Sequence, residues 1–574
     1  MPQTRLGIDP ANLDASDPYL REKQTFPTLN DEQIERVKAF GDVEDLSKCE
    51  VLFERGDRTV DFFLVLKGSI EIYEHTREGL SVFTVHREKQ FTGEIDLFND
   101  RKILVGGRMG EDGTVVRINR ENFKKLMVAE PGIGEIITRA YILRRVALIS
   151  HKQGSVTVIT KGQSADTVRL ERFLRRNGYP VDVLNCDEDN CEEVLSRYEI
   201  TEKDLPAVLI HLGDEIVINP SNYELAEHLG LLEEIDKDDV YDVTIIGGGP
   251  SGLSAAVYAA SEGLKTLLVE HEAPGGQAGT SSKIENYLGF PTGVSGQALA
   301  GRAIVQAMKF GAKILLPYSV TGIRQNSNRT YELSLCDETK LCTKSIVVAS
   351  GASYRTLDLE NGRAFDNAGI YYAATAMESN LCKNEEVIVV GGGNSAGQAA
   401  VFLSEHSKHV HMLVRRDGLA ATMSEYLIDR IHSSPKITLH THSEISALNG
   451  DEHHLESVTW KNSKDGSEET HDIRHVFLMI GAMANTEWLG SCFARDEKGF
   501  ICTGEEVSSH SWWDLERHPM MLETSSPGIF AVGDVRAGST KRVASGVGEG
   551  SICISQVHQY LATLTKDDEL EKAA

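Results

Sequence analysis

One glycine-rich segment has the residue types and the spacing that bind a pyrophosphate. It follows the apolar run Val243–Ile246 and contains Gly247, Gly249, Pro250, Ser251 and Gly252. In such a loop the first glycine permits a tight turn, the second lets the backbone approach the phosphates, and the third lets a helix pack against a strand. The N-terminus of that helix stabilises the phosphate charge. A second strand ends at Glu270, whose carboxylate can accept hydrogen bonds from ribose hydroxyls, so the segment predicts a dinucleotide site.

A second segment of the same construction follows the apolar run Val387–Val390. It contains Gly391, Gly393, Asn394, Ser395 and Ala396, with alanine in the place of the third glycine. Its second strand ends in Arg415 and Arg416 instead of a carboxylate. Guanidinium groups bind a ribose 2′-phosphate, whereas a carboxylate selects a free 2′-hydroxyl. The two arginines therefore predict NADP(H) rather than NAD(H); the alternative is a solvated basic turn.

Further segments resemble bacterial thioredoxin reductases, and the resemblance extends from about residue 238 to residue 574. They are a stretch with Gly276 and Gln277, the stretch Glu285–Pro291 with Asn286, the stretch Ala349–Ala352, the stretch Pro527–Val535 with Gly533 and Asp534, and a closing stretch with Arg542, Val543 and Ala544. The resemblance implies FAD at the first loop and NADPH at the second, with hydride passing between them. It also implies that Asp534 binds the ribityl chain, that the last helix begins near the flavin, and that the protein is a homodimer.

The redox-active cysteine pair of that family is absent from the matching stretch, Gly369–Glu378. Ala373 and Ala376 occupy the two positions, so the sequence predicts no catalytic residue there. Without a thiolate, this site can neither attack a disulfide nor form a mixed disulfide. We therefore expect a flavoenzyme that takes hydride from NADPH and passes electrons to a non-dithiol acceptor, namely a protein carrier, a quinone, oxygen or a peroxide. Smaller departures from the family pattern are Val414, Ala420 and Val543, which replace a histidine, an arginine and a glutamine.

Two alternatives stay open. In the first, the chain reduces disulfides with cysteines from elsewhere, such as Cys382 just before the second glycine loop, or with those of a partner protein. In the second, the chain is a regulatory protein whose nucleotide domains sense NADPH or FAD. Retention of both glycine loops, of the paired arginines and of Asp534 favours turnover over sensing.

The N-terminal segment Phe91–Val105 resembles the phosphate cassette of a cyclic-nucleotide-binding β-roll. The resemblance includes Gly93 and implies that Glu94 holds the ribose 2′-hydroxyl and that Arg101 pairs with the cyclic phosphate. The residues that depart from the usual small side chains of the cassette are Asp96, Lys102 and Ile103. The carboxylate among them should repel a phosphate. One alternative is a domain that binds a cyclic nucleotide; the other is a docking or dimerisation domain that has lost its ligand.

Residues 151–235 resemble a thioredoxin or glutaredoxin fold. The segment Leu205–Val208 is similar to the cis-proline strand of that fold, and Thr160–Thr167 aligns with its active-site loop. Ser164 and Thr167 stand in the cysteine positions. Serine and threonine are good helix caps, so we expect both to be structural and the module to lack a redox dithiol.

These segments predict an α/β multidomain protein. The expected parts are an N-terminal β-roll at 1–150, the small thioredoxin-like domain at 151–235, an FAD-binding domain at 239–355 and 487–574, and an NADP(H)-binding domain at 356–486. Inside the module the apolar pattern predicts a strand at Ser155–Thr160 and a helix at Ala165–Asn177. Rotation between the last two domains would bring nicotinamide to flavin, with hinges expected near Ala349–Gly351 and Glu487–Gly490.

Composition and charge narrow the remaining functions. The formal net charge of −27 argues against nucleic acid and against an anionic membrane as partners. The apolar runs are too short to span a bilayer, and no signal peptide precedes them. The nine cysteines form no CxxC, and an odd number without a secretory signal is typical of reduced thiols in the cytoplasm. We expect all of them, including the close pairs Cys186/Cys191 and Cys336/Cys342, to be ordinary thiols and not metal ligands.

Overall fold

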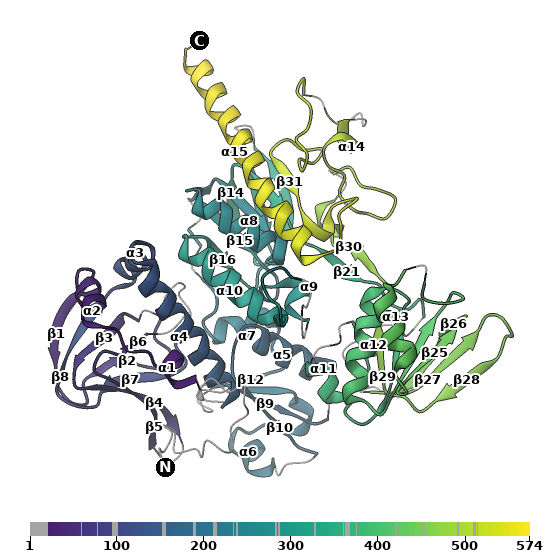
Figure 1. The fold of residues 1–574 in the computed structure, drawn as a ribbon, viewed down its shortest axis with the longest axis horizontal. Helices are drawn as coiled ribbons and strands as arrows, with labels where there is room; N and C mark the ends of the chain where they lie inside the picture. Colours follow the sequence, from purple (N-terminus) through teal and green to yellow (C-terminus); the bar gives the residue numbers. More distant parts are fainter. Residues whose placement is uncertain are drawn as a thin grey trace.

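The structure of the protein is a computed structural model. It describes residues 21–573 except 59, 77–78, 94–101, 152–155, 163, 188–190, 211–214, 234, 237–238, 282–283, 285–286, 327–328, 360, 362–364, 366–367, 373, 375, 421, 452–453, 491–492, 509–512 and 514. No helix within these ranges is both long and apolar enough to cross a bilayer. Figure 1 shows the chain from the purple N-terminal sheets to the yellow C-terminal helix.

Two antiparallel four-stranded sheets form the N-terminal β-roll, in the orders β1-β8-β3-β6 and β2-β7-β4-β5. The strands are β1 (Asp42–Leu46), β2 (Val51–Phe53), β3 (Phe62–Lys67), β4 (Ser69–Thr76), β5 (Gly79–Arg87), β6 (Phe91–Thr92), β7 (Gly106–Met109) and β8 (Gly113–Ile118). The helices are α1 (Glu22–Thr25), α2 (Asp31–Lys38), α3 (Arg120–Ala129) and α4 (Pro131–Ser150). Strand β3 carries four buried residues in succession, because both of its faces lie inside the roll.

The next module has one four-stranded sheet in the order β10-β9-β11-β12. Its elements are β9 (Val156–Thr160), α5 (Ala165–Arg176), β10 (Val181–Asn185), α6 (Glu192–Arg197), β11 (Ala207–Ile210), β12 (Glu215–Ile218) and α7 (Asn222–His228). Strand β9 is parallel to β10 and antiparallel to β11. Ser164 caps α5 by accepting a hydrogen bond from the Thr167 backbone N–H at 3.1 Å, as its residue type predicts.

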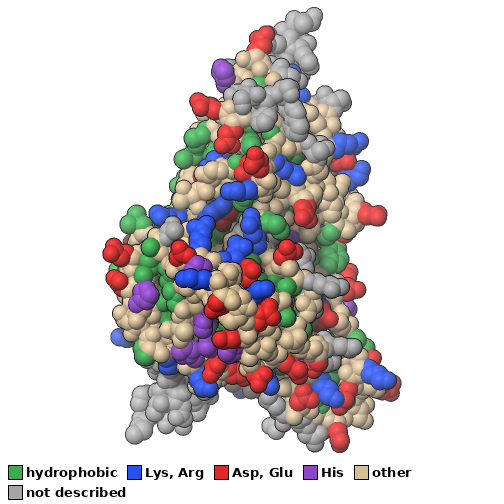
Figure 2. All heavy atoms as spheres, turned by 90° about the vertical axis from the view of Figure 1, so that its right-hand side faces the viewer, with side chains coloured by type: hydrophobic (Ala, Val, Ile, Leu, Met, Phe, Trp, Pro, Cys, Tyr) green, Lys and Arg blue, Asp and Glu red, His purple; other side chains and the backbone are tan. Residues whose placement is uncertain are grey.

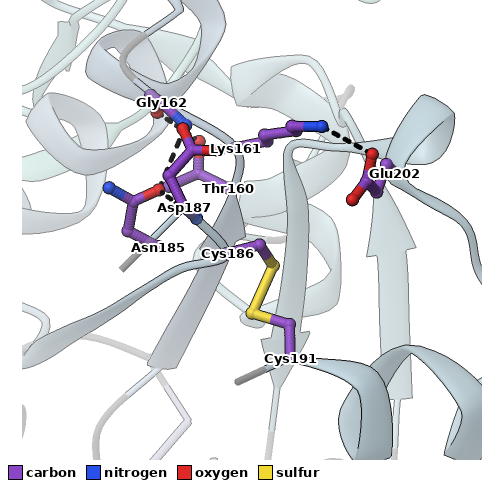
Figure 3. Close-up of a disulfide and its surroundings, with 8 residues drawn as sticks. All are labelled: Thr160, Lys161, Gly162, Asn185, Cys186, Asp187, Cys191 and Glu202. Atoms are coloured by element: carbon purple, nitrogen blue, oxygen red, sulfur yellow. Dashed lines mark hydrogen bonds and ion pairs between the residues drawn. A yellow bond between two sulfur atoms is a disulfide. The ribbon is translucent and has the colours of Figure 1, made fainter. Parts of the chain in front are cut away.

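Cys186 and Cys191 of this module form a disulfide with their Cα atoms 5.3 Å apart (Figure 3). The expectation that every cysteine is a reduced thiol is therefore wrong for this pair. Cys186 directly follows β10, which ends at Asn185, and Cys191 directly precedes α6, which begins at Glu192. The other cysteines in the described part of the chain are free.

The first α/β domain is built on a parallel five-stranded sheet in the order β16-β15-β14-β20-β31, with a second sheet, β13-β19-β18-β17, beside it. The strands are β13 (Val240–Tyr241), β14 (Val243–Ile246), β15 (Thr266–Val269), β16 (Lys313–Leu315), β17 (Val320–Gln325), β18 (Tyr331–Leu335), β19 (Lys340–Thr343), β20 (Ile346–Val348) and β31 (Ile529–Ala531). The helices are α8 (Pro250–Ser261), α9 (Gly276–Gly279), α10 (Gly296–Lys309), α14 (Glu505–Ser508) and α15 (Val543–Ala573).

The second α/β domain has a parallel sheet in the order β22-β29-β23-β24-β25 and an antiparallel sheet, β26-β27-β28. The strands are β22 (Ile370–Tyr371), β23 (Glu386–Val390), β24 (His409–Val414), β25 (Ile437–Thr441), β26 (Ser443–Gly450), β27 (Leu455–Asn462), β28 (Glu468–His471) and β29 (His475–Leu478). The helices are α11 (Ala376–Leu381), α12 (Asn394–His406) and α13 (Glu425–Ser433).

The two α/β domains are joined by an antiparallel ribbon of β21 (Ala352–Tyr354) and β30 (Ala482–Ala484). Figure 1 shows the second domain, in green, held to one side at this ribbon. One apolar core runs without interruption through the β-roll, the module and the first α/β domain, from Phe62 through Phe173 to Leu253. The second domain has separate cores. The first three parts therefore pack as one body.

Candidate functional site

The first glycine loop leaves β14 at Gly247 and enters α8 at Pro250. Gly247 has a φ of +106°, and a Cβ there would lie 2.4 Å from the Ala349 carbonyl oxygen of the neighbouring strand. A Cβ on Gly252 would lie 1.9 Å from the Gly247 carbonyl oxygen. Neither position has room for a side chain, so both glycines are needed for the strand, the turn and the helix to pack this closely.

The N-terminus of α8 faces a second glycine segment. Gly249 is the N-cap of this 12-residue helix. Gly276 has a φ of +51°, and a Cβ on it would lie 3.0 Å from the Gly249 Cα. This cradle of bare backbone beside the N–H groups of a helix N-terminus fits a dinucleotide pyrophosphate. Gln277 follows at the exposed start of α9, and Asn286 lies outside the described residues.

Glu270 directly follows β15 beside this cradle and is only 4% exposed. Its carboxylate accepts hydrogen bonds from the Gly248 N–H at 2.6 Å and from the Glu272 N–H at 3.0 Å. Burial raises the pKa of Glu270, but His271 and these N–H donors outweigh it and hold the pKa below its usual range. The Oε1 atom also lies 3.1 Å from the His271 Nδ1, whereas Oε2 accepts from the Gly248 N–H. A carboxylate oxygen has two lone pairs, so Oε2 can still accept from a ribose hydroxyl.

The stretch Pro527–Val535, which the resemblance assigns to FAD binding, reaches the same loop at Ser251. A Cβ on Gly533 would lie 2.2 Å, and one on Gly546 2.4 Å, from the Ser251 Oγ. The Gly533 N–H donates to Glu549 of α15 at 2.6 Å. Asp534 comes next, and its burial raises the pKa of its carboxyl against the opposing charge of Lys541.

Helix α15 begins at the predicted flavin-contacting stretch. Its first residues are Val543 and Ala544, and Arg542 precedes them; Arg542 and Ala544 are exposed and Val543 is half-buried. Farther along, the Ser254 Oγ of α8 donates to the Val547 carbonyl at 2.7 Å. The structure thus brings the predicted FAD residues that it describes to one end of the first α/β domain.

The second glycine loop repeats this geometry between β23 and α12. Gly391 has a φ of +138°, and a Cβ on it would lie 2.3 Å from the Met479 carbonyl oxygen. Gly393 is the N-cap of α12, Ser395 is exposed and Ala396 is buried. The Asn394 Oδ1 accepts from the Ser424 N–H at 2.7 Å, which ties the loop to the segment before α13.

Arg415 and Arg416 follow β24 and are both exposed. They lie next to the loop, because a Cβ on Gly392 would be 3.6 Å from Val414. The Thr422 Oγ1 holds the backbone of the glycine loop, because it donates to the Gly392 carbonyl at 2.7 Å. Two guanidinium groups beside an exposed helix N-terminus suit an adenosine ribose with a 2′-phosphate.

The stretch Gly369–Glu378, in which Ala373 and Ala376 occupy the positions predicted from the resemblance for a cysteine pair, lies in the second α/β domain. Ala373 is outside the described residues, and Ala376 begins α11. Cys382 comes six residues after Ala376, is fully buried, and donates its S–H to the Glu378 carbonyl at 3.3 Å. Burial raises the pKa of the Cys382 thiol to about 12. A thiol this shielded and this weakly acidic is a poor nucleophile.

The β-roll holds a pocket between its sheets and α4. Its lining is mainly apolar and also includes Gly93 and Arg144. The apolar side chains are those of Phe26, Phe53, Val60, Ile72, Phe83 and Ile103. Arg144 is engaged in the fold, since its guanidinium donates to the Thr25 carbonyl at 2.8 Å and to the Phe91 carbonyl at 2.9 Å. Glu94 and Arg101 lie outside the described residues.

Two arginines that the sequence patterns did not indicate connect the module to the segment that contains the predicted FAD residue Gly276. Arg172 and Arg176 of α5 bind the carboxylate of Glu272 at 2.8 Å and 2.9 Å. Arg176 also donates to the carbonyls of Ala273 and Gly276 at 3.1 Å and 3.2 Å. Their i,i+4 spacing on one helix was the available signal.

Comparison with family models gives two matches. A model described as pyridine nucleotide-disulphide oxidoreductase matches residues 241–550, and a cyclic nucleotide-binding domain model matches residues 43–130. The first range contains both glycine loops and the connecting ribbon; the second contains the sheets of the β-roll.

Individual relatives match the same part of the chain. Thioredoxin reductase of Listeria innocua is 30% identical over 338 residues, which are 59% of this chain and 99% of that protein. NADPH-dependent thioredoxin reductase 3 of Arabidopsis thaliana is 32% identical over 331 residues, 56% of this chain and 59% of that protein. The crystal structure of Lactococcus lactis thioredoxin reductase is similar with a TM-score of 0.50 at 30% identity, over 56% of this chain and 99% of that one.

Proposed function

We propose that this chain, which belongs to the pyridine nucleotide-disulphide oxidoreductase family, oxidises NADPH through FAD and passes the electrons to an acceptor that is not a dithiol. The thioredoxin reductase family that it resembles uses FAD and NADPH. The supporting observation is that side chains of opposite charge lie beside the two glycine loops. The first loop has the buried Glu270, and the second has the exposed Arg415 and Arg416. Bound FAD would supply the acceptor for a hydride from NADPH.

The residues of the first loop have distinct tasks in this proposal. The backbone of Gly249 and Gly276 would hold the FAD pyrophosphate, and Glu270 would accept from the adenosine ribose. Asp534 would accept from the ribityl hydroxyls. Burial raises the pKa of Asp534. Hydrogen bonds from hydroxyl donors would oppose this effect, because they favour the ionised form of the carboxyl.

The second loop would bind NADPH through Gly393 and the two arginines. Transfer requires the nicotinamide to reach the flavin, and the ribbon of β21 and β30 is the natural pivot for that motion. A glycine directly precedes each strand of this ribbon: Gly351 has a φ of +70° and Gly481 a φ of +98°. The separate cores of the second domain allow it to rotate as a unit.

The class of acceptor is inferred from the cysteines of the chain. The chain has no CxxC, and Cys382 is buried with a raised pKa. Electrons would therefore leave directly from the flavin to a protein carrier, a quinone, oxygen or a peroxide. We further propose a cytoplasmic homodimer joined through the FAD domain, which light scattering after size exclusion would test.

Anaerobic titration with NADPH tests the proposal. The purified protein should absorb near about 450 nm and bleach with one equivalent of NADPH. The reduced protein is then mixed separately with oxygen, a quinone, ferredoxin, flavodoxin and oxidised thioredoxin, and reoxidation is followed at the same wavelength. Fast reoxidation by thioredoxin alone, or a flavin that NADPH leaves oxidised, contradicts the proposal.

A matched variant restores the missing chemistry. Ala373→Cys combined with Ala376→Cys should give oxidised thioredoxin a reoxidation rate that the parent chain lacks, because a dithiol at these positions would supply the exchange step. The control is Ala376→Ser, which adds a polar atom of similar size but no thiol.

A docking role for the β-roll is a second candidate function, and Lys102 favours it. Its side chain lies on the module, where a Cβ on Gly230 would be 2.4 Å from the Lys102 Cγ, and its ammonium donates to the His228 carbonyl at 3.4 Å. Titration with cyclic AMP and cyclic GMP tests this role. A ligand at about 100 times its Kd would stabilise the protein by about 2.7 kcal/mol, whereas a pure docking domain leaves the melting temperature unchanged.

A further inference from the structure

The disulfide Cys186–Cys191 lies at one end of the module, between β10 and α6 (Figure 3). Cys186 is half-buried, whereas Cys191 is only 4% exposed and packs against Ile159 and Ala207. The two sulfurs thus differ in access. An incoming thiolate can reach Cys186, and Cys191 is the shielded sulfur that would leave.

The disulfide adjoins the turn that follows β9. The Cys186 N–H donates to the Thr160 carbonyl at 2.8 Å, and the Gly162 N–H donates to the Asn185 Oδ1 at 3.1 Å. Lys161, which lies between them, directs its ammonium to Glu202 at 2.6 Å and away from the sulfurs (Figure 3). This turn begins the segment in which Ser164 and Thr167 occupy the expected cysteine positions. The module instead carries its sulfur pair beyond the neighbouring strand, between the end of β10 and the start of α6.

The surroundings of the reachable sulfur are acidic. Asp187 follows Cys186 and is exposed, and Glu192 and Glu193 follow Cys191 and are exposed. Lys161, a cation in the adjoining turn, is paired with Glu202. The negative charge of these carboxylates repels an anionic reagent that approaches Cys186 in low salt, and high salt screens this repulsion.

We propose that Cys186–Cys191 is a redox-active disulfide that exchanges with an external dithiol bearing no net negative charge. A thiolate of that dithiol attacks the Cys186 Sγ, the S–S bond breaks, and the Cys191 thiolate leaves and takes up a proton. The second thiol of the reagent then attacks the mixed disulfide and releases Cys186. The reagent ends as a disulfide and the protein as two thiols, so two electrons and two protons are transferred.

Mass spectrometry of the alkylated full-length protein tests the first part. Air-exposed protein, denatured in N-ethylmaleimide, should carry seven adducts on its nine cysteines. Native protein treated with dithiothreitol before alkylation should carry nine. Nine adducts without reduction, or a pair that dithiothreitol reduces only in denaturant, overturns the proposal.

Variants assign the change to this pair. Cys186→Ser and Cys191→Ser should each remove the gain of two adducts on reduction. The control is Cys49→Ser, which removes an exposed free thiol of the β-roll and should keep the gain. If the gain survives in Cys186→Ser, another pair carries it and the proposal fails.

The charge of the reductant tests the second part. The rate at which the Cys186–Cys191 disulfide is reduced is measured with dithiothreitol, which is neutral, and with dihydrolipoate, which is anionic. Each rate is divided by the rate of the same reductant with a small neutral disulfide, and the two normalised rates are compared as a ratio. The ratio should favour dithiothreitol about fivefold at low salt, as one like-charge contact in water predicts, and should approach one in 1 M NaCl. Asp187→Asn should reduce it. A ratio of one at low salt contradicts the charge selection.

This inference does not depend on the proposed flavin chemistry. NADPH alone should leave the count at seven adducts, because the structure shows no second disulfide among the described residues that could relay electrons from the proposed flavin site to Cys186–Cys191. Loss of the disulfide on NADPH addition, without any thiol, would overturn the external-dithiol route. Flavin bleaching is read separately at its own wavelength, so the two proposals can fail independently.

Discussion

Arg176 in the module and Glu272 in the first α/β domain form an ion pair with a nitrogen–oxygen distance of 2.9 Å. Both side chains are largely buried, with 16% and 13% of their surface exposed. The same guanidinium donates to the Gly276 carbonyl, which belongs to the pyrophosphate cradle. The module therefore helps to hold the backbone that the proposed FAD site uses.

Replacing Arg176 by alanine should lower the free energy of unfolding by about 2 kcal/mol, the typical loss for a charged hydrogen bond in a partly buried site. FAD should also dissociate faster, because the Gly276 carbonyl loses its donor. Thermal denaturation with flavin fluorescence measures both. The control is Arg175→Ala, which removes a more exposed pair with Glu171; equal effects in the two variants would contradict a specific role of Arg176.

The preference for NADPH should depend on Arg415 and Arg416. Alanine at either position should raise the KM for NADPH about tenfold or more, as the loss of one charge-assisted hydrogen bond to a phosphate implies. The KM for NADH should change little, since that coenzyme lacks the 2′-phosphate. Steady-state kinetics with both coenzymes distinguishes this outcome from a general loss of binding. Lys436→Ala is a matched removal of positive charge away from the loop.

Histidines gather on the face that the second α/β domain presents in Figure 2. The His411 Nδ1 lies 3.1 Å from the His440 Nε2, and the ring of His471 stacks on Trp460 at 3.9 Å. Two carboxylates border the group: Glu386 is 3.5 Å from the His411 Nε2, and Glu469 pairs with His471 at 3.2 Å.

This histidine group should make the second domain less stable in mild acid. Burial, together with the neighbouring imidazoles, lowers the pKa values of His411 and His440. The unfolded chain then binds more protons below about pH 6.5, so stability should fall as the pH drops through that value. Thermal melts from pH 7.5 to 5.5 measure the slope. His411→Gln should flatten it and the exposed His432→Gln should not; the same slope in both variants would count against this origin.

Cys382 should have no part in turnover. It is buried with a raised pKa, so Cys382→Ala should leave the rate of NADPH oxidation within about twofold and cost about 1 kcal/mol of stability through the small cavity left. Iodoacetamide should label Cys382 in the native protein far more slowly than the exposed Cys49. Loss of activity in Cys382→Ala, with the flavin still bound, would instead favour a displaced catalytic thiol.

Local patterns predicted much of the fold. The strand expected at Ser155–Thr160 is β9, and the helix expected at Ala165–Asn177 is α5, one residue different at an end. Glycine spacing placed both loops between a strand and a helix, because turn, close approach and packing each need a bare backbone at a fixed offset.

Contacts between distant segments were not predictable in this way. The Arg176–Glu272 pair joins residues 96 apart, and the position of Lys102 on the module depends on how two domains pack. The Cys186–Cys191 bond was not predicted, because its spacing matches no redox motif and only the folded structure shows the two sulfurs bonded.

The ribbon of β21 and β30 places Ala352 opposite Ala484, so the chain enters and leaves the second α/β domain at adjacent points. Such neighbours are about 5 Å apart, a gap that a hairpin turn of two to five residues closes. The coenzyme domain is therefore an exchangeable cassette. Its gene segment could be removed, or replaced by one with another nicotinamide preference, while the remaining chain keeps its own path.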